Sequence, residues 1–307
     1  VGQTVSKGKK MKKLYFAVVI VFCATLCFSQ ESLNPSFEFS GIDEFWDVVD
    51  TLKKDLDPSQ AQWDKLFSTP GYAVLIKREF KKEKLQQFIT CAYKPSLQEE
   101  KAQLIEKSKD IKGWFWKWFT PSYFKALEYT DVNRAKVIAK RNSFNTFPYT
   151  QQAITELLKF LPEDQVTNPP QVSFIVFNDS RGYTPVVMGL NDMVAGDDEL
   201  TDEQVAKLKD LGFNRYRPQV LYFAHEFFHH FRDQKLEFKM PENNRLDSQL
   251  IWNINQIENE GIADLINVSP LYKLGVSKYK DRIDKEQKLV PEQIKGFSDV
   301  LAGIYSN

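Results

Sequence analysis

Histidine and cysteine are scarce in this chain of 307 residues, which contains only three of each. Cys23 and Cys27 lie in an apolar stretch near the N-terminus, so Cys91 is the one cysteine in the remainder of the chain. A single thiol cannot form an internal disulfide, which excludes a disulfide-stabilised fold for that remainder. We therefore expect Cys91 to be a small buried hydrophobic residue.

The sequence also has no excess charge, because its 41 basic residues are balanced by 41 acidic ones. This balance gives no general attraction to nucleic acid or to anionic lipid, and we expect no nucleic-acid partner. Internal repeats and low-complexity tracts are absent as well. The length is that of one or two domains with a sizeable core.

The N-terminal residues have the pattern of a cleavable signal peptide. Two lysines follow Met11, the expected start of translation, and an apolar run occupies residues 14–28. Small residues at the −3 and −1 positions predict cleavage after Ser29. Residues 1–29 are then upstream residues and leader, and the mature chain begins at Gln30 in a secreted or periplasmic protein.

The apolar run is short for a membrane helix, and polar residues follow it at once. We therefore expect no stable membrane span. A lipoprotein anchor fits less well, because the bulky Phe22 and Leu26 precede the two cysteines where a small residue is needed.

The mature chain divides near residue 165 into two regions. In residues 30–165, apolar positions recur at three- and four-residue spacing, which predicts a helical region. Residues 166–307 begin with two strand-like segments, 172–177 and 184–190, which we expect to form a hairpin. Helices are predicted after them at residues 201–211, with a Thr201 and Gln204 capping box, 218–231 and 248–267, with more helix beyond Pro270.

All three histidines lie within six residues, in the sequence Ala-His-Glu-Phe-Phe-His-His from Ala224 to His230. His225 and His229 are one helical turn apart, so both imidazoles lie on one side of the predicted helix. Glu226 stands beside them. Two imidazoles with an adjacent carboxylate suit a catalytic Zn²⁺ ion and a general base for the water that it activates. His230 should point away from this site.

A second motif, Asn-Glu-Gly-Ile-Ala-Asp, begins at Asn259. Because no histidine remains elsewhere, the third zinc ligand should be a carboxylate, and Glu260 is the best candidate. Asp264, one turn later, can accept the second ring N–H of a ligating histidine. Gly261 and Ala263 are small enough to let the two helices approach closely.

Together, the two motifs resemble those of the gluzincin zinc peptidases, the thermolysin-like clan. They are also similar to uncharacterised secreted bacterial families of zinc-dependent peptidases. The resemblance covers about 50 residues. It implies zinc ligands His225, His229 and Glu260, the general base Glu226, and Asp264 as support for a ligand. The resemblance does not extend to the N-terminal half, but with the helical pattern of residues 30–165 we expect an α+β fold, mostly helical. In it the helical N-terminal half packs on a zincin-like domain that has a small β-sheet and the H-E-x-x-H helix.

One departure concerns the transition state. Thermolysin-like enzymes use a further downstream histidine to stabilise the tetrahedral intermediate, and this chain has none. Tyr272, twelve residues after Glu260, is our choice for that role. Arg245, Tyr183 and Tyr279 are alternatives.

Three further features allow more than one interpretation. Trp114, Trp116 and Trp118 could form an aromatic surface contact with a membrane or ligand, although packing between the two halves is favoured. The acidic residues around 197–203 fit a solvated helix N-terminus better than a calcium site. Residues 183–192 could be an edge strand that binds an extended peptide.

The leading interpretation is a secreted zinc metallopeptidase that acts on a peptide or protein substrate. The main alternative is a non-catalytic, zinc-stabilised binding or scaffold protein of the cell envelope, which the missing histidine favours. A zinc hydrolase acting on a non-peptide amide or ester is the third.

Overall fold

The computed structural model describes residues 35–110, 114–144, 150–161, 166, 168, 170–198, 200–213, 216–235, 245–273 and 284. Contacts place them in a compact unit that begins at Pro35. The predicted signal peptide, Met11 to Ser29, and the predicted helix towards Asn307 lie outside the described residues. Among the helices described, none is long and apolar enough to cross a membrane.

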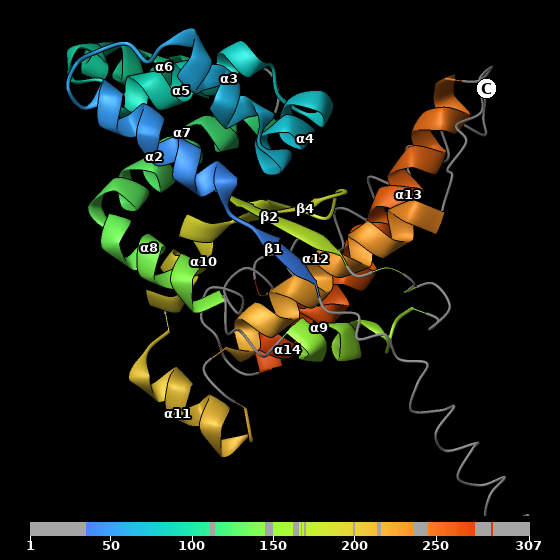
Figure 1. The fold of residues 1–307 in the computed structure, drawn as a ribbon. Coiled ribbons are helices and arrows are strands. Elements are labelled where there is room, and N and C mark those ends of the chain that lie inside the picture. The colour runs from blue at the N-terminus through green and yellow to red at the C-terminus, as the bar shows by residue number, and fades with distance from the viewer. Residues whose placement is uncertain are drawn as a thin grey trace, which may run out of the picture. The chain divides into compact units, whose positions relative to one another are not determined.

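Helices account for most of the residues before the second strand, in agreement with the helical pattern of the sequence (Figure 1). Ser59 and Gln62 form a capping box at the start of α3, and Pro70 begins α4. The helices are α2 (Ser40–Leu52), α3 (Gln60–Ser68), α4 (Pro70–Arg78), α5 (Lys82–Tyr93), the 3₁₀ turn η1 (Pro95–Leu97), α6 (Gln98–Lys109), α7 (Trp114–Val132), α8 (Arg134–Ser143) and α9 (Thr150–Leu157).

A mixed sheet of four described strands has the order β1-β2-β4-β3. Pairing is parallel between β1 and β2 and between β2 and β4, and antiparallel between β3 and β4. The predicted hairpin of residues 172–177 with 184–190 is therefore wrong. The short β3 reverses the chain between them, and both segments become buried inner strands. The strands are β1 (Ser36–Glu38), β2 (Gln171–Ile175), β3 (Ser180–Arg181) and β4 (Val186–Gly189).

Strand β1 comes from the predicted helical region, yet it pairs with β2 from the second region. Three residues are too few to give a recognisable strand pattern in the sequence. The strand forms through pairing with residues more than 130 positions away. One sheet thus includes residues from both sides of position 165. The division of the mature chain into two domains at this position stays a prediction.

The two faces of β2 are covered by different helices, as the alternation of side chains along a strand requires. Ile175 contacts α2 at Gly41 and α4 at Gly71, where an added Cβ would come within 2.6 Å of its side chain. Phe174 points to the other face and packs on Phe144 and Phe223. The sheet therefore lies between α2 and α4 on one face and the end of α8 together with α12 on the other.

Buried aromatic rings fill much of the core, as the composition suggested. Phe119 contacts Phe80, Tyr123 and Phe177, so α7 is joined to the end of β2 through ring packing. Cys91 is 2% exposed, which confirms its prediction as a small buried residue.

After the sheet, the chain is again helical. The predicted Thr201 and Gln204 capping box is confirmed at α11, whose first turn holds Asp202 and Glu203, as expected for a helix N-terminus. The predicted helix 218–231 is observed as Arg217–Lys235, and the predicted helix 248–267 is observed as Arg245–Ile266. These elements are α10 (Leu190–Asp198), α11 (Asp202–Asp210), α12 (Arg217–Lys235), α13 (Arg245–Ile266) and α14 (Val268–Lys273).

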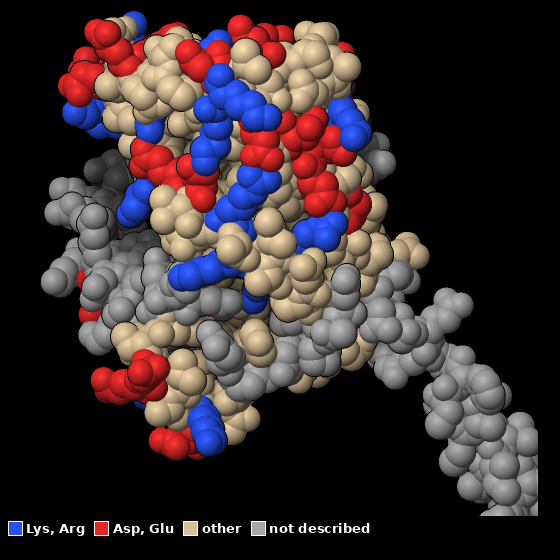
Figure 2. Space-filling view, turned by 60° about the vertical axis from the view of Figure 1, so that its left-hand side comes forward, with Lys and Arg blue, Asp and Glu red and all other residues tan. Residues whose placement is uncertain are grey.

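Figure 2 shows acidic and basic side chains interspersed on one face of the molecule. Ion pairs such as Lys53–Asp131 and Arg134–Asp50 connect different helices. Exposed pairs of this kind contribute little stability each. The mixed signs agree with the zero net charge of the sequence.

Candidate metal centre

Helix α12 holds the H-E-x-x-H motif inside the compact unit (Figure 1). Its phenylalanines Phe223, Phe227 and Phe231 are fully buried, in agreement with a helix that is apolar nearly all round. The helix contacts α9, β3 and β4 with some residues and α13 with others. The two histidines of the motif lie on the α13 side.

His225 and His229 direct the same ring atom toward one point. Their Nε2 atoms are 3.1 Å apart, and His229 Nε2 lies 3.6 Å from Oε2 of Glu260. One ligand atom from each of the three residues lies within 4.8 Å of the others. Tetrahedral zinc with bonds of about 2.0–2.1 Å separates its ligand atoms by about 3.3 Å. The three residues thus fit a zinc ion in donor type and in spacing.

The opposite ring atoms of both histidines face oxygen atoms on α13. His229 Nδ1 lies 3.0 Å from Oδ1 of Asn259, and His225 Nδ1 lies 4.0 Å from Oδ1 of Asp264. A proton on each Nδ1 would leave both Nε2 atoms as lone-pair donors, which is the tautomer that a metal requires. Sequence reasoning assigned this supporting position to Asp264 but missed Asn259. The position of Asn259 directly before Glu260 in the sequence was the signal that could have indicated its role.

Helices α12 and α13 are antiparallel and joined by polar contacts about one turn apart. Arg232 donates to Oδ1 of Asn255 at 2.7 Å and to Oε2 of Glu258 at 3.2 Å. One turn earlier on α12, His229 meets Asn259, and one turn earlier again His225 faces Asp264. Ala263 is buried between the helices as predicted, but Gly261 lies on the exposed side, so it does not govern their approach.

The three candidate ligands differ in exposure. The side chains of His225 and His229 are 12% and 11% exposed, whereas the side chain of Glu260 is 58% exposed. Helix α12 thus covers one side of the cluster, and solvent reaches it from the side of Glu260. Catalytic zinc sites have three protein ligands and one accessible position, and this asymmetry suits that arrangement.

Glu226 is adjacent to the cluster in sequence but is not one of its three members. Its side chain is buried, with 4% exposure. Burial raises the pKa of Glu226 well above its usual range, and the carboxylates of Asp179 and Glu260 raise it further, whereas the Arg181 guanidinium opposes the rise.

The short edge strand β3 and the residues after it lie directly against the motif. A Cβ added to Gly182 would come within 2.3 Å of His229 Cβ and 2.5 Å of the Glu226 carbonyl oxygen, so only glycine permits this contact. His230 is buried and donates from Nδ1 to the Tyr183 carbonyl at 2.8 Å. It thus has a structural position, fastening the β3–β4 connection to α12.

Among the described strands, β1 and β3 form the two edges of the sheet, whereas β4 lies between β2 and β3. The expectation that residues 183–192 form an edge strand is therefore wrong, because the strand in that segment, β4, is an inner one and residues 190–192 belong to α10. The described edge next to the motif belongs to Ser180 and Arg181. A strand of only two residues flanked by loops gives little periodicity for sequence reasoning to detect.

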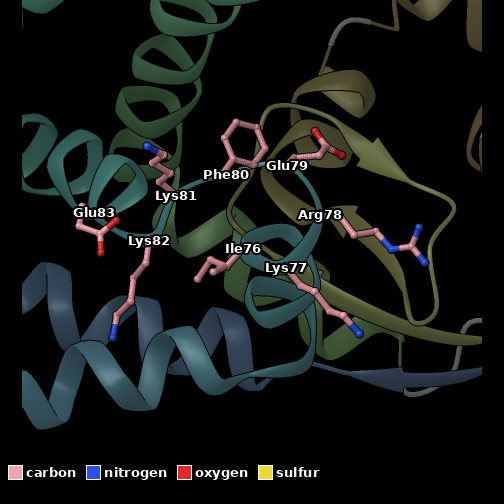
Figure 3. A pocket seen from close by; sticks show the side chains of 8 residues that line it. All are labelled: Ile76, Lys77, Arg78, Glu79, Phe80, Lys81, Lys82 and Glu83. Carbon is pink, nitrogen blue, oxygen red and sulfur yellow. The ribbon is translucent and has the colours of Figure 1, made fainter. Parts of the chain in front are cut away.

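An ion network supports β3 from the N-terminal helices. Arg181 donates to both oxygens of Glu79, at 2.6 and 3.2 Å, and to Asp179 at 2.6 Å. Tyr183 also donates to Glu79, and the Arg78 guanidinium lies 4.7 Å from the centre of the Tyr183 ring. Figure 3 shows Arg78 and Glu79 directed toward the β3–β4 hairpin from an open cavity of about 440 Å³ lined by residues 76–83.

The candidates for transition-state stabilisation are dispersed. Tyr272, on α14, donates to Asp284 at 3.2 Å, and Asp284 is not one of the three residues of the cluster. Tyr183 donates to Glu79. The Arg245 side chain and all of Tyr279 lie outside the described residues. The role of Tyr272 therefore stays a prediction.

Among the tryptophans of α7, Trp116 packs edge-on against Phe80 and Phe119. Both rings belong to the helical region, so Trp116 packs within that region, and packing between the two halves stays a prediction. The side chains of Trp114 and Trp118 lie outside the described residues, so a surface contact through them stays a prediction.

Two histidines and a glutamate on antiparallel helices, beside the edge of a mixed sheet, define a candidate zinc site in a mostly helical α+β protein. The chain belongs to the family described as "Putative zinc dependent peptidase (DUF5700)", whose model matches residues 63–307. The match includes the H-E-x-x-H helix and α13, and it supports a zinc peptidase family at a coarse level. The search of curated proteins and the search of solved structures gave no match.

Proposed function

We propose that the protein is a secreted zinc metallopeptidase of the gluzincin type. The observation that carries the proposal is the convergence of His225 Nε2, His229 Nε2 and a Glu260 carboxylate oxygen within 4.8 Å. The family match supports a peptidase that depends on zinc and acts on peptides or proteins. The gluzincin type rests on the glutamate ligand from a following helix, and secretion rests on the predicted leader.

In this proposal His225, His229 and Glu260 hold the zinc ion, which would polarise the scissile carbonyl and make an attacking water more acidic. Asn259 orients His229 by accepting from its Nδ1, and Asp264 lies 4.0 Å from Nδ1 of His225, on the side from which it would support that imidazole. Glu226, in its ionised form, accepts the proton of the attacking water and then delivers it to the leaving amine. Its raised pKa makes the carboxylate a stronger base for this transfer, and its burial limits the access of bulk water to the side chain.

The free edge of β3 would hold the substrate backbone. An extended peptide can pair with an exposed strand edge through main-chain hydrogen bonds, and β3 is held against the motif by Gly182. The Arg181–Glu79 pair fixes the strand, so the substrate would meet a rigid edge. The substrate backbone would then pair with the outer edge of β3, and Glu226, on the helix that Gly182 contacts, would transfer the proton.

The test is a comparison of zinc content and peptide hydrolysis in the chain from Gln30 to Asn307 and its variants. We expect one zinc per chain, most of it lost in His229→Ala and Glu260→Ala. Glu226→Gln should keep zinc and lose hydrolysis of a mixed peptide library. Absence of zinc in the unaltered chain purified without chelator, or full activity of Glu226→Gln, would contradict the proposal.

A non-catalytic, zinc-stabilised envelope protein is the second candidate. It is favoured by the lack of a fourth histidine and by the contact of Tyr272 with Asp284. Zinc coordination distinguishes the two functions. Four protein ligands around the metal in X-ray absorption spectra, with no hydrolysis of peptides, amides or esters, would favour the second candidate.

A further inference from the structure

The outer face of α13 carries a row of exposed apolar positions. Ile254, Ile257 and Leu265 are 49%, 62% and 54% exposed. Gly261 is also exposed, and a Cβ added to it would meet no atom within 4 Å. Successive positions are three or four residues apart, so they form one stripe along the helix. We call these four residues the α13 stripe.

The stripe contrasts with the apolar residues on the opposite side of the same helix. Ala263 and Ile266 are 0% and 2% exposed. Large aliphatic side chains exposed in a continuous row indicate a surface that another element covers, whereas single exposed ones need no explanation. The helix that bears Glu260 therefore has one face packed in the core and another without a partner among the described residues.

A matching pattern occurs in the C-terminal segment, residues 285–307. Ile294, Phe297, Leu301 and Ile304 are separated by three, four and three residues. In a helix they would lie on one side, and polar or small residues would occupy the other. The segment has the composition of an amphipathic helix that needs an apolar surface.

The two patterns agree in length and in antiparallel register. The stripe covers eleven residue steps of α13, or about 16 Å, and the segment pattern covers ten steps, or about 15 Å. The longest side chain, Phe297, falls opposite the open space at Gly261. The pairs are Leu265 with Ile294, Gly261 with Phe297, Ile257 with Leu301 and Ile254 with Ile304.

The connection between the two is short enough and begins at the right place. Asp284 accepts a hydrogen bond from Tyr272 in α14, which follows α13 directly. Ile294 is ten residue steps after Asp284, and an extended chain of that length reaches about 33 Å. The segment can therefore begin near Leu265 and run back along α13.

We propose that the part of this segment from Pro291 onward docks on the α13 stripe as an amphipathic helix antiparallel to α13. The docked segment covers the stripe, and it holds the helix of Glu260 from the side away from Ala263. The family match continues to residue 307, so the segment is part of the region that the family shares. The proposal stands whether or not the cluster binds zinc.

The test uses engineered disulfides in the chain from Gln30 to Asn307. The matched pair is Ile257→Cys with Leu301→Cys, and the control pair is Ile257→Cys with Asp299→Cys, which places the second thiol on the opposite side of the segment. Under mild oxidation of metal-depleted protein, we expect an intramolecular disulfide to form at least tenfold faster in the matched pair. Mass spectrometry of peptides identifies the bond.

Two disulfide results would overturn the proposal. Equal rates in both pairs would show that the segment has no fixed register on α13. A bond formed only between two chains would show that a second copy covers the stripe.

Hydrogen exchange gives a second measurement that does not need new cysteines. Phe297→Asp should make amides of residues 254–265 exchange at least tenfold faster, whereas the control Lys295→Asp should leave them unchanged. Equal exchange in the two variants would contradict docking through Phe297.

Discussion

Helix α12 has two faces of opposite character. Toward the sheet it presents buried phenylalanines such as Phe223, which touches Phe144 and Phe174. Toward α13 it presents His225, His229 and Arg232, each facing a polar atom at a defined place. An apolar face can pack on many surfaces of suitable shape, but a buried polar face needs a matching partner for each atom. The first face specifies the fold, and the second specifies the candidate site.

The largest expected effect is on catalysis, and it comes from a substitution beside the polar face that leaves the packing unchanged. Glu226→Gln preserves shape but removes the carboxylate that accepts a proton, so peptide hydrolysis should fall by about 10²–10⁴-fold. Zinc content and the thermal unfolding midpoint should stay near those of the unaltered protein, because neither requires this charge. A parallel loss of zinc would show that Glu226 holds the metal instead.

A substitution on the apolar face of α12 should instead lower the stability of the fold. Phe223→Ala removes a fully buried ring from contacts with four other phenylalanines, which should lower the free energy of unfolding by about 3–5 kcal/mol. The control is Phe213→Ala, since that ring is 36% exposed and should cost far less. Denaturant unfolding at constant zinc compares the two. Equal losses would contradict the division of α12 into a packing face and a polar face.

The contrast between the faces also explains what could be predicted from sequence. The apolar periodicity around Phe223 and Phe227 is local, and the predicted helix 218–231 is contained in the observed Arg217–Lys235. Strand β1 could not be found in this way, because Ser36–Glu38 becomes a strand only through β2. For the inner strands the signal was present but was interpreted wrongly. All four residues of β4 are buried, a pattern typical of parallel inner strands.

The candidate site was predicted in its three ligands and in the supporting Asp264, but not in the rest of its support. The histidine spacing and the downstream Glu260 are visible in sequence, and the structure brings them together. The contact of Asn259 with His229 depends on how α13 is rotated against α12, and the position of Gly182 depends on sheet order. Both are properties of packing between distant segments, which local patterns do not encode.

Within the polar face, the contacts with α13 can be separated by two matched substitutions. Asn259→Ala removes the acceptor at His229 Nδ1 and should weaken zinc binding by about 10–100-fold. Asn255→Ala is the same change one turn away, but it affects Arg232 and should leave zinc affinity unchanged. Competition with a chromophoric chelator measures both. Equal affinities in the two variants would mean that Asn259 does not orient the ligand.

The smallest expected effect on stability concerns the contact between α9 and the start of α12, where Glu156 pairs with Arg217. Burial raises the pKa of Glu156, but hydrogen bonds from Arg217 and Lys159 outweigh it and hold that pKa below its usual value. A lowered folded-state pKa adds stability above the unfolded-state value of about 4.5, and this stability is lost as the pH falls through the folded-state value. Glu156→Gln should therefore cost up to about 1 kcal/mol at pH 7 and almost nothing near pH 3. Urea unfolding at both pH values tests this, and an equal loss at both would mean that Glu156 contributes through packing and not through its charge.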